Sequence, residues 1–128
     1  MPIDATAPYD PQNVFARILR GEIPSNTVYE DEWALAFHDI NPLAPVHVLV
    51  IPKGAYVSMA DFSAGASDAE FVGFFRAVGK IARDLGLEEG GYRMLTNTGA
   101  AAHQEVPHLH VHLFAGAPLG PMLRKVSG

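Results

Sequence analysis

The sequence predicts an α+β fold in which two helices pack against a five-stranded antiparallel sheet. Its apolar patterns follow in the order helix, three strands, helix, two strands, which lacks the regular strand–helix alternation of a parallel sheet. The chain has 128 residues, 48% of them hydrophobic, enough for the core of one domain. We therefore expect a single domain over residues 10–128. Residues 1–9 contain two prolines and no apolar period, which predicts a flexible N-terminal arm.

The first predicted helix begins directly after this arm. Asp10 is the expected N-cap, with Pro11 at the first helical position. Gly21 and Pro24 are expected to end the helix. Its apolar stripe consists of Val14, Phe15, Ile18 and Leu19.

Three strands are expected next. Residues 27–30 and 33–38 form two apolar-rich runs around the acidic pair Asp31-Glu32, which indicates a β-hairpin. Residues 46–51 are apolar except for His47, as expected of a buried strand. One histidine is thus expected inside a buried strand.

The main helix and two further strands complete the pattern. Ser67 and Glu70 form a capping-box pattern, and apolar residues follow at helical spacing as far as Gly86. Residues 92–97 and 106–114 have strand character. Because Pro107 has no backbone N–H, regular pairing is expected to begin around His108.

Composition excludes several functional classes. Fourteen acidic residues outnumber nine Lys and Arg, which argues against nucleic-acid binding. The chain has no cysteine, so disulfides and thiolate metal sites are excluded. No apolar run approaches the roughly 18 residues of a membrane span, and no signal-peptide pattern opens the chain. We expect a cytoplasmic protein without membrane association.

Three histidines alternate with apolar residues in the last predicted strand. His108, His110 and His112 are expected to project to one face, because side chains at i, i+2 and i+4 share a face of a strand. Chance alternation of unrelated histidines is one interpretation. A zinc site completed by His47 or His103 is another, although no carboxylate is spaced like a usual companion ligand.

The third interpretation is nucleophilic catalysis at phosphorus. A neutral imidazole is abundant at pH 7, since its ordinary pKa is about 6.5, and its nitrogen can attack a phosphoryl centre. A second imidazole can supply the proton that the leaving group needs. Neighbouring rings repel each other's charge, so their titrations separate and they can take different roles.

The run from His108 to Phe114, His-Leu-His-Val-His-Leu-Phe, resembles the signature of the histidine triad (HIT) family. Three further segments resemble the HINT-like branch of that family in order and spacing. They are residues 15–24, residues 36–53 and residues 91–97.

This resemblance implies an antiparallel five-stranded sheet with two helices, and a homodimer with one continuous ten-stranded sheet. It also implies hydrolysis of purine nucleoside phosphoramidates and of acyl- or aminoacyl-adenylates, which releases AMP or GMP through a covalent nucleotidyl-histidine. No metal or other cofactor is implied.

By the same resemblance, His110 is the nucleophile and His112 assists at the phosphate and leaving group. His108 orients the nucleophile through its backbone carbonyl, and His47 is a supporting fourth histidine. Implied nucleotide contacts are Asn97, Gln104 and Glu105 at the phosphate, Asp39 at the ribose, and Val14, Phe15, Ile18, Phe37, His38 and Ile40 around the base.

One segment departs from the family pattern. Residues 102–105 read Ala-His-Gln-Glu where many relatives have Gly-Gly-Gln followed by Ser or Thr, so His103 replaces a glycine and Glu105 replaces a hydroxyl. Two other functions stay open. One is hydrolysis of dinucleoside polyphosphates or nucleotidyl transfer by the same intermediate, and the other is nucleotide binding with weak catalysis.

Overall fold

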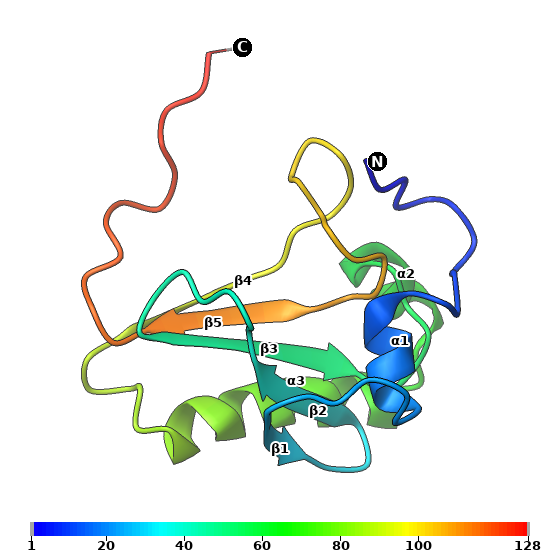
Figure 1. Cartoon of the computed structure of the whole chain (residues 1–128), viewed down its shortest axis with the longest axis horizontal. Helices are drawn as coiled ribbons and strands as arrows, with labels where there is room; N and C mark the ends of the chain where they lie inside the picture. Colours follow the sequence, from blue (N-terminus) through cyan, green and yellow to red (C-terminus); the bar gives the residue numbers. More distant parts are fainter. Residues whose placement is uncertain (1, 128) are drawn as a thin grey trace.

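The computed structural model describes residues 2–127 and contains a five-stranded antiparallel sheet in the order β1-β2-β3-β5-β4 (Figure 1). The α+β prediction is confirmed. Residue 1 of the predicted arm (residues 1–9) lies outside the described residues. So does residue 128 of the predicted domain (residues 10–128). The strands are β1 (Thr27–Glu30), β2 (Ala34–His38), β3 (Val46–Pro52), β4 (Tyr92–Leu95) and β5 (Val111–Ala115).

Residues 2–127 contain three helices rather than the two predicted: α1 (Val14–Leu19), α2 (Met59–Gly65) and α3 (Asp68–Asp84). The additional helix, α2, has a capping box in which Ser58 accepts from the first turn and Asp61 reaches back to the backbone of Ser58. Its sequence therefore carried a helix signal, with Asp in place of the usual Glu or Gln. None of the helices of residues 2–127 is long and apolar enough to cross a membrane.

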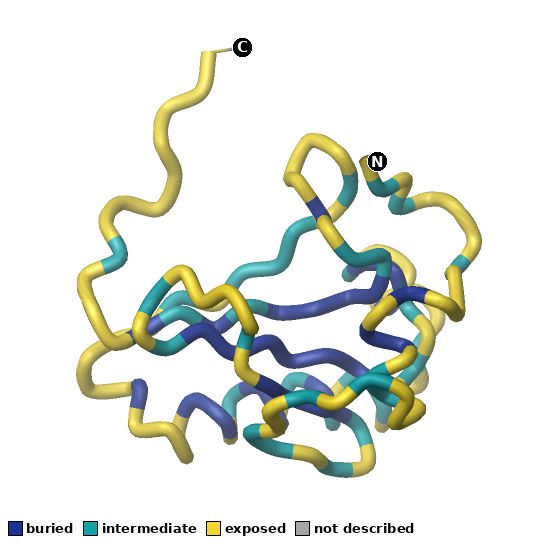
Figure 2. The backbone as a smooth tube through the Cα atoms, viewed as in Figure 1, coloured by how far each residue is buried: buried dark blue, intermediate teal, exposed yellow. Residues whose placement is uncertain are grey.

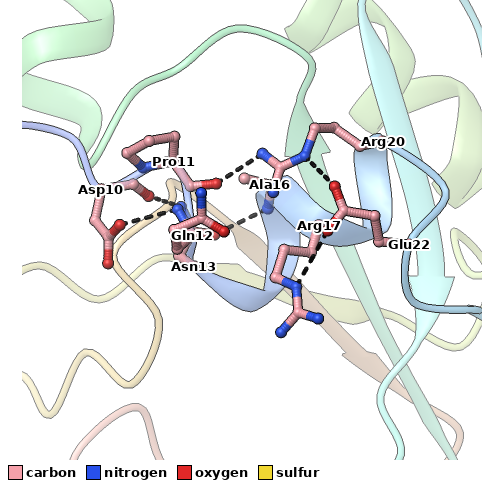
Figure 3. A network of polar contacts seen from close by, with 8 residues as sticks. All are labelled: Asp10, Pro11, Gln12, Asn13, Ala16, Arg17, Arg20 and Glu22. Carbon is pink, nitrogen blue, oxygen red and sulfur yellow. Dashed lines mark hydrogen bonds and ion pairs between the residues drawn. The ribbon is translucent and has the colours of Figure 1, made fainter.

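The predicted N-cap of α1 is wrong. Asn13 caps the helix, and its Oδ1 accepts from the N–H of Ala16 at 2.9 Å. Asp10 instead begins a turn before the helix, in which its Oδ1 accepts from the N–H of Gln12 at 2.9 Å (Figure 3). The helix is displaced because Asn13 competes with Asp10 for the same capping role and lies nearer to the apolar stripe.

Charged side chains hold the two ends of α1 together. Arg20 donates to the carbonyl of Pro11 at 2.7 Å, and its Nε pairs with Glu22 (Figure 3). The helix has only six residues, so it depends on such contacts and on burial of Phe15 and Ala16.

The central strands β2 and β3 are buried on both faces of the sheet, and Figure 2 shows the buried strip along β3 and β5. Alternate residues of β2, β3 and β5 pack with α2 and α3 in one cluster that includes Val48, Val50, Phe74 and Leu113. The opposite residues form a smaller cluster with α1, made of Phe15, Leu35, Phe37, Leu49 and Ile51. The second face therefore has a smaller apolar cover than the first.

Several strand ends differ from prediction. The hairpin is present, but β2 begins at Ala34 because Asp31 Oδ1 accepts from the N–H groups of both Trp33 and Ala34. Strand β3 continues to Pro52, and β4 ends at Leu95 rather than at residue 97.

Strand β5 begins at Val111, three residues later than the expected start of pairing. The N–H of Leu109 bonds to the carbonyl of Tyr56 at 2.8 Å instead of joining the ladder. As a result, His108 and His110 lie before the strand, and only His112 lies within it. Leu109, Val111 and Leu113 still face the core together, so the predicted alternation holds.

Candidate active site

A cavity of about 570 Å³ opens on the sheet face opposite α3. Its floor comes from β3 and β5, which pair antiparallel so that Leu49 lies opposite His112. The predicted site residues that line it are Phe15, Asp39, His47, Asn97, Glu105, His110 and His112, together with the loop residue His103.

The ring of His110 is fixed at one nitrogen. Its Nδ1 donates to the backbone carbonyl of His108 at 2.7 Å, because a carbonyl can only accept. In the neutral ring, Nε2 is then the unprotonated nitrogen. The edge of the ring meets Phe15, with centroids 5.0 Å apart, and the hydroxyl of Thr96 donates to the carbonyl of His110 at 2.8 Å. The unprotonated Nε2 therefore belongs to a residue, His110, that is 5% exposed and lines the cavity.

His47 and His112 form a hydrogen-bonded pair beside it. The N–H of Leu43 donates to Nδ1 of His47 at 3.1 Å, so His47 carries its proton on Nε2. That Nε2 donates to Nδ1 of His112 at 2.9 Å, which leaves the proton of a neutral His112 on its own Nε2. Asp39 Oδ2 lies 3.5 Å from Nε2 of His47. The rings of His110 and His112 are 5.0 Å apart, so a lone pair and an N–H donor are adjacent.

Burial keeps these imidazoles neutral. It lowers the pKa of His108 to about 4, and it lowers the pKa of His112 to about 4 with help from the neighbouring His110 and His47. Burial also lowers the pKa of His110, although the carbonyl of His108 opposes the shift. The pKa of His47 is lowered by burial and partly restored by Asp39.

The comparison with known families agrees with this geometry. The model of the HIT domain matches residues 20–119. The chain belongs to the histidine triad family.

Relatives cover nearly the whole chain. A HIT-like protein of Azospirillum brasilense is 68% identical over 91% of this chain and 96% of its own length. The purine nucleoside phosphoramidase of Escherichia coli K12 is 44% identical over 88% of this chain and 93% of its own. Among solved structures, a HIT family hydrolase from Clostridium thermocellum is 42% identical with a TM-score of 0.76, covering 88% of this chain and 97% of that one.

Two of the histidine triad residues lie at the cavity and the third does not. The ring of His108 is fully buried behind them, and its Nε2 donates to the carbonyl of Pro52 at 2.9 Å. Only its backbone carbonyl reaches the site, through the bond from His110. His108 projects to the same face as His110, since both rings meet Phe15 edge to face, but it lies deeper and does not line the cavity.

Gln104 lies behind the HIT cavity rather than in it. Its amide nitrogen donates to the carbonyls of Val57 and Val106, at 2.9 and 3.0 Å, and its oxygen accepts from the N–H of Gly99 at 2.9 Å. The side chain thus holds the loop before the triad in place. It has no donor left for a phosphate in this arrangement.

The predicted base pocket is only partly assembled. Phe15, Ile18 and Phe37 pack in the cluster under α1, and of these only Phe15 lines the cavity. His38 is exposed on the α3 side of β2, because it alternates with Ala34 and Ala36. Val14 and Ile40, 39% and 91% exposed, also lie off the cavity.

Four contacts of the site were not predicted. Leu43 fixes the tautomer of His47 through its backbone, Thr96 holds the carbonyl of His110, and Tyr9 bonds to His108. Phe114 stacks parallel to His112 with centroids 5.5 Å apart. Only Phe114 carried a signal, since it follows His112 by two residues on the same strand face.

Asp39, His47 and His112 also have ligand atoms within 4.8 Å of one another. These are groups that bind zinc in other proteins. However, the His47 Nε2 to His112 Nδ1 separation of 2.9 Å is that of two nitrogens sharing a proton. That proton would have to leave before both nitrogens bound one ion.

Proposed function

We propose that this protein hydrolyses purine nucleoside phosphoramidates and acyl- or aminoacyl-adenylates, and releases AMP or GMP through a covalent nucleotidyl-His110. The observation that carries the proposal is the unprotonated Nε2 of His110 at the cavity, beside the proton-bearing pair His47 and His112. The name of the Escherichia coli relative and the hydrolase name of the Clostridium thermocellum neighbour support it.

In the first step, Nε2 of His110 attacks phosphorus as the P–N bond to the amine breaks. The departing amine needs one proton, and the His47–His112 pair delivers it. A bound phosphate anion favours protonation of this pair, because opposite charge raises an imidazole pKa. In the second step, water attacks phosphorus, its proton returns to the pair, and the N–P bond to His110 breaks.

Four neighbouring groups are proposed to bind the nucleotide. Asp39 accepts hydrogen bonds from the ribose hydroxyls, and Asn97 together with the backbone of Glu105 contacts the phosphate. Each of these residues lines the cavity. Phe15 offers the base an aromatic surface at the same cavity.

The central test is steady-state hydrolysis of an adenosine phosphoramidate by metal-free protein, with chelator present throughout. Wild type is expected to turn over, and His110→Asn to lose activity entirely, because no neighbouring group replaces the nucleophile. A single turnover stopped by rapid denaturation at alkaline pH, where an N–P bond to imidazole is stable, should place one adenylyl group on the peptide that contains His110. A folded His110→Asn, checked by its denaturation midpoint, excludes unfolding as the cause.

Other outcomes identify the rival functions. Activity that is lost in chelator and restored by zinc would assign the cluster to a metal. AMP binding without turnover in any condition would assign a nucleotide-binding module. Faster turnover on diadenosine polyphosphates than on the phosphoramidate would assign the other hydrolase class of the family.

Asp39→Ala is expected to weaken AMP binding about tenfold, because a charged acceptor of the ribose hydroxyls is lost. Binding of inorganic phosphate should not change. The matched control is Asp4→Ala, because Asp4 lies off the cavity. The two carboxylates make similar local contacts: Asp4 accepts from the N–H of Thr6 at 2.9 Å, and Asp39 accepts from the N–H of Asn41 at 2.8 Å. Calorimetric titrations in which AMP and phosphate weaken equally would refute the ribose role.

A further inference from the structure

The last residue of the predicted arm reaches the triad. The Tyr9 hydroxyl lies 2.5 Å from Nδ1 of His108, a residue 99 positions later in the chain. The two rings meet edge to face, with centroids 5.6 Å apart and planes at 69°. Tyr9 is half-buried and His108 has no exposed surface, so this contact lies inside the protein.

The direction of this hydrogen bond follows from the other nitrogen of His108. Nε2 lies 2.9 Å from the carbonyl of Pro52, which can only accept, so the ring proton is on Nε2. A neutral ring then has a bare Nδ1, and the Tyr9 hydroxyl is the donor. Burial raises the pKa of Tyr9, so the phenol keeps the proton that it donates.

These contacts form one chain that ends at the nucleophile. The ring of His108 is held at both nitrogens, by Tyr9 and by Pro52. The backbone carbonyl of the same residue accepts from Nδ1 of His110 at 2.7 Å and thereby orients that ring. The contact from Tyr9 and the bond from the nucleophile thus meet in one residue, His108.

We propose that Tyr9 is a positioning residue, which acts through His108 to aim Nε2 of His110 at the substrate phosphorus. The inference rests on the proposed function, in which His110 is the nucleophile. Without the Tyr9 hydroxyl, the fully buried Nδ1 of His108 would lose its hydrogen-bond donor. A buried acceptor without a donor reorients or admits water to regain a hydrogen bond. Misplacement of a reacting atom by a fraction of an ångström slows chemistry with little effect on binding.

The arm before Tyr9 contacts the loop that bounds the cavity. Ala5 lies against Gly99, and residues 2–5 share a hollow with Gly99 and Ala100. In Figure 1 the N-terminal segment descends beside this loop to α1. The contribution of the Tyr9 hydroxyl must therefore be separated from that of the arm as a whole.

The test compares Tyr9→Phe with Tyr29→Phe in the full chain, with an adenosine phosphoramidate as substrate. Each variant removes one hydroxyl that bonds to a side chain. The hydroxyl of Tyr29 donates to Asp31 at 2.7 Å, and neither residue lines the cavity. We expect Tyr9→Phe to lower kcat about tenfold with KM within about twofold, and Tyr29→Phe to leave both constants unchanged. Deletion of residues 2–8, which retains Tyr9, should also retain kcat.

A second measurement does not depend on turnover. Nitrogen-15 spectra of the histidine side chains should show His108 protonated on Nε2, with an Nδ1 resonance that moves on Tyr9→Phe and not on Tyr29→Phe. An Nδ1 that is protonated in the wild type, or a Tyr9→Phe kcat equal to that of wild type, would overturn the proposal. Absence of turnover in wild-type protein would instead refute the proposed function, and the spectra would still decide whether Tyr9 holds His108.

Discussion

His103 has a backbone conformation that its neighbours avoid. Among residues 2–127 it alone has a positive φ, 58°, without being glycine. This left-handed region costs a residue with a Cβ about 1 kcal/mol. The side chain gives little in return to stability, because it is 88% exposed and its approach to Glu105 is solvated.

His103→Gly should therefore raise the free energy of unfolding by up to about 0.5 kcal/mol, because the greater entropy of unfolded glycine offsets about 0.5 to 1 kcal/mol of the relieved strain. The matched control is Ala102→Gly in the same loop, where φ is not positive and glycine should destabilise. Urea titrations of both variants provide the measurement. Equal losses of stability in the two would show that His103 is not strained.

At the residue scale, the sequence identified the histidines of the site but not the groups that fix their tautomers. His110 and His112 were predictable because strand alternation places them on one face. The partners of the rings come from Leu43, Pro52 and Tyr9, which act through backbone groups or a single hydroxyl. Such contacts depend on tertiary geometry and leave no local pattern.

At the scale of elements, the long helix α3 shows how a glycine can be required by packing. A Cβ on Gly73 would overlap the indole of Trp33, which lies against the helix just before β2. Gly79, on the same helix, has room: a Cβ there would meet only Arg83 Nη1, at 3.5 Å. Packing therefore requires glycine at position 73 of this helix but not at position 79.

Gly73→Ala is expected to lower the free energy of unfolding by about 1 to 3 kcal/mol, since the indole must leave its place on α3. Gly79→Ala should raise it by about 0.5 to 1 kcal/mol through helix propensity. Thermal or urea unfolding of the two variants checks both signs at once. A stabilised Gly73→Ala would mean that Trp33 moves without cost.

The elements that sequence reasoning predicted best are those with a strong period. Helix α3 follows its predicted cap, Ser67, the strand predicted to be buried is β3, and the alternation predicted for the last strand holds in β5. Errors arose at element ends, where one hydrogen bond decides the boundary. The bond from Leu109 to Tyr56 delays β5, and a competing side chain moves the start of α1.

At the scale of the whole molecule, buried neutral histidines make stability depend on pH. Folding lowers the pKa of His108 and of His112 from 6.5 to about 4, so between these values the unfolded chain binds more protons than the native one. The stability that they contribute is complete above about pH 6.5 and is lost as the pH falls to about 4. For His108 alone this loss is about 3 kcal/mol, at about 1.36 kcal/mol for each pH unit.

The expected outcome is a urea midpoint that falls steadily between pH 6.5 and pH 4.5 and is level from pH 6.5 to pH 8. Most carboxylates titrate below this window, so the histidines dominate it. A midpoint that is flat across the window would show that the rings bind protons as readily in the folded protein as in the unfolded chain, and the lowered pKa values would then be refuted.

The homodimer with a continuous ten-stranded sheet stays a prediction. Strand β4 is an edge of the sheet, and its Tyr92 and Met94 are 43% and 51% exposed. An edge strand with unpaired backbone groups can pair with a second chain. A single chain's sequence pattern cannot fix this association, because it depends on surface complementarity rather than on local periodicity.

The position of Trp33 determines what optical methods can report. It is the single tryptophan of the chain, and with Tyr29 and Gly73 it lines a groove of about 410 Å³ that shares no residue with the histidine cavity. Its emission therefore follows the separation of α3 from the hairpin and does not sense a molecule in the cavity. Unfolding curves can be recorded by intrinsic fluorescence with nucleotide present, whereas occupancy must be followed by calorimetry or by the histidine resonances.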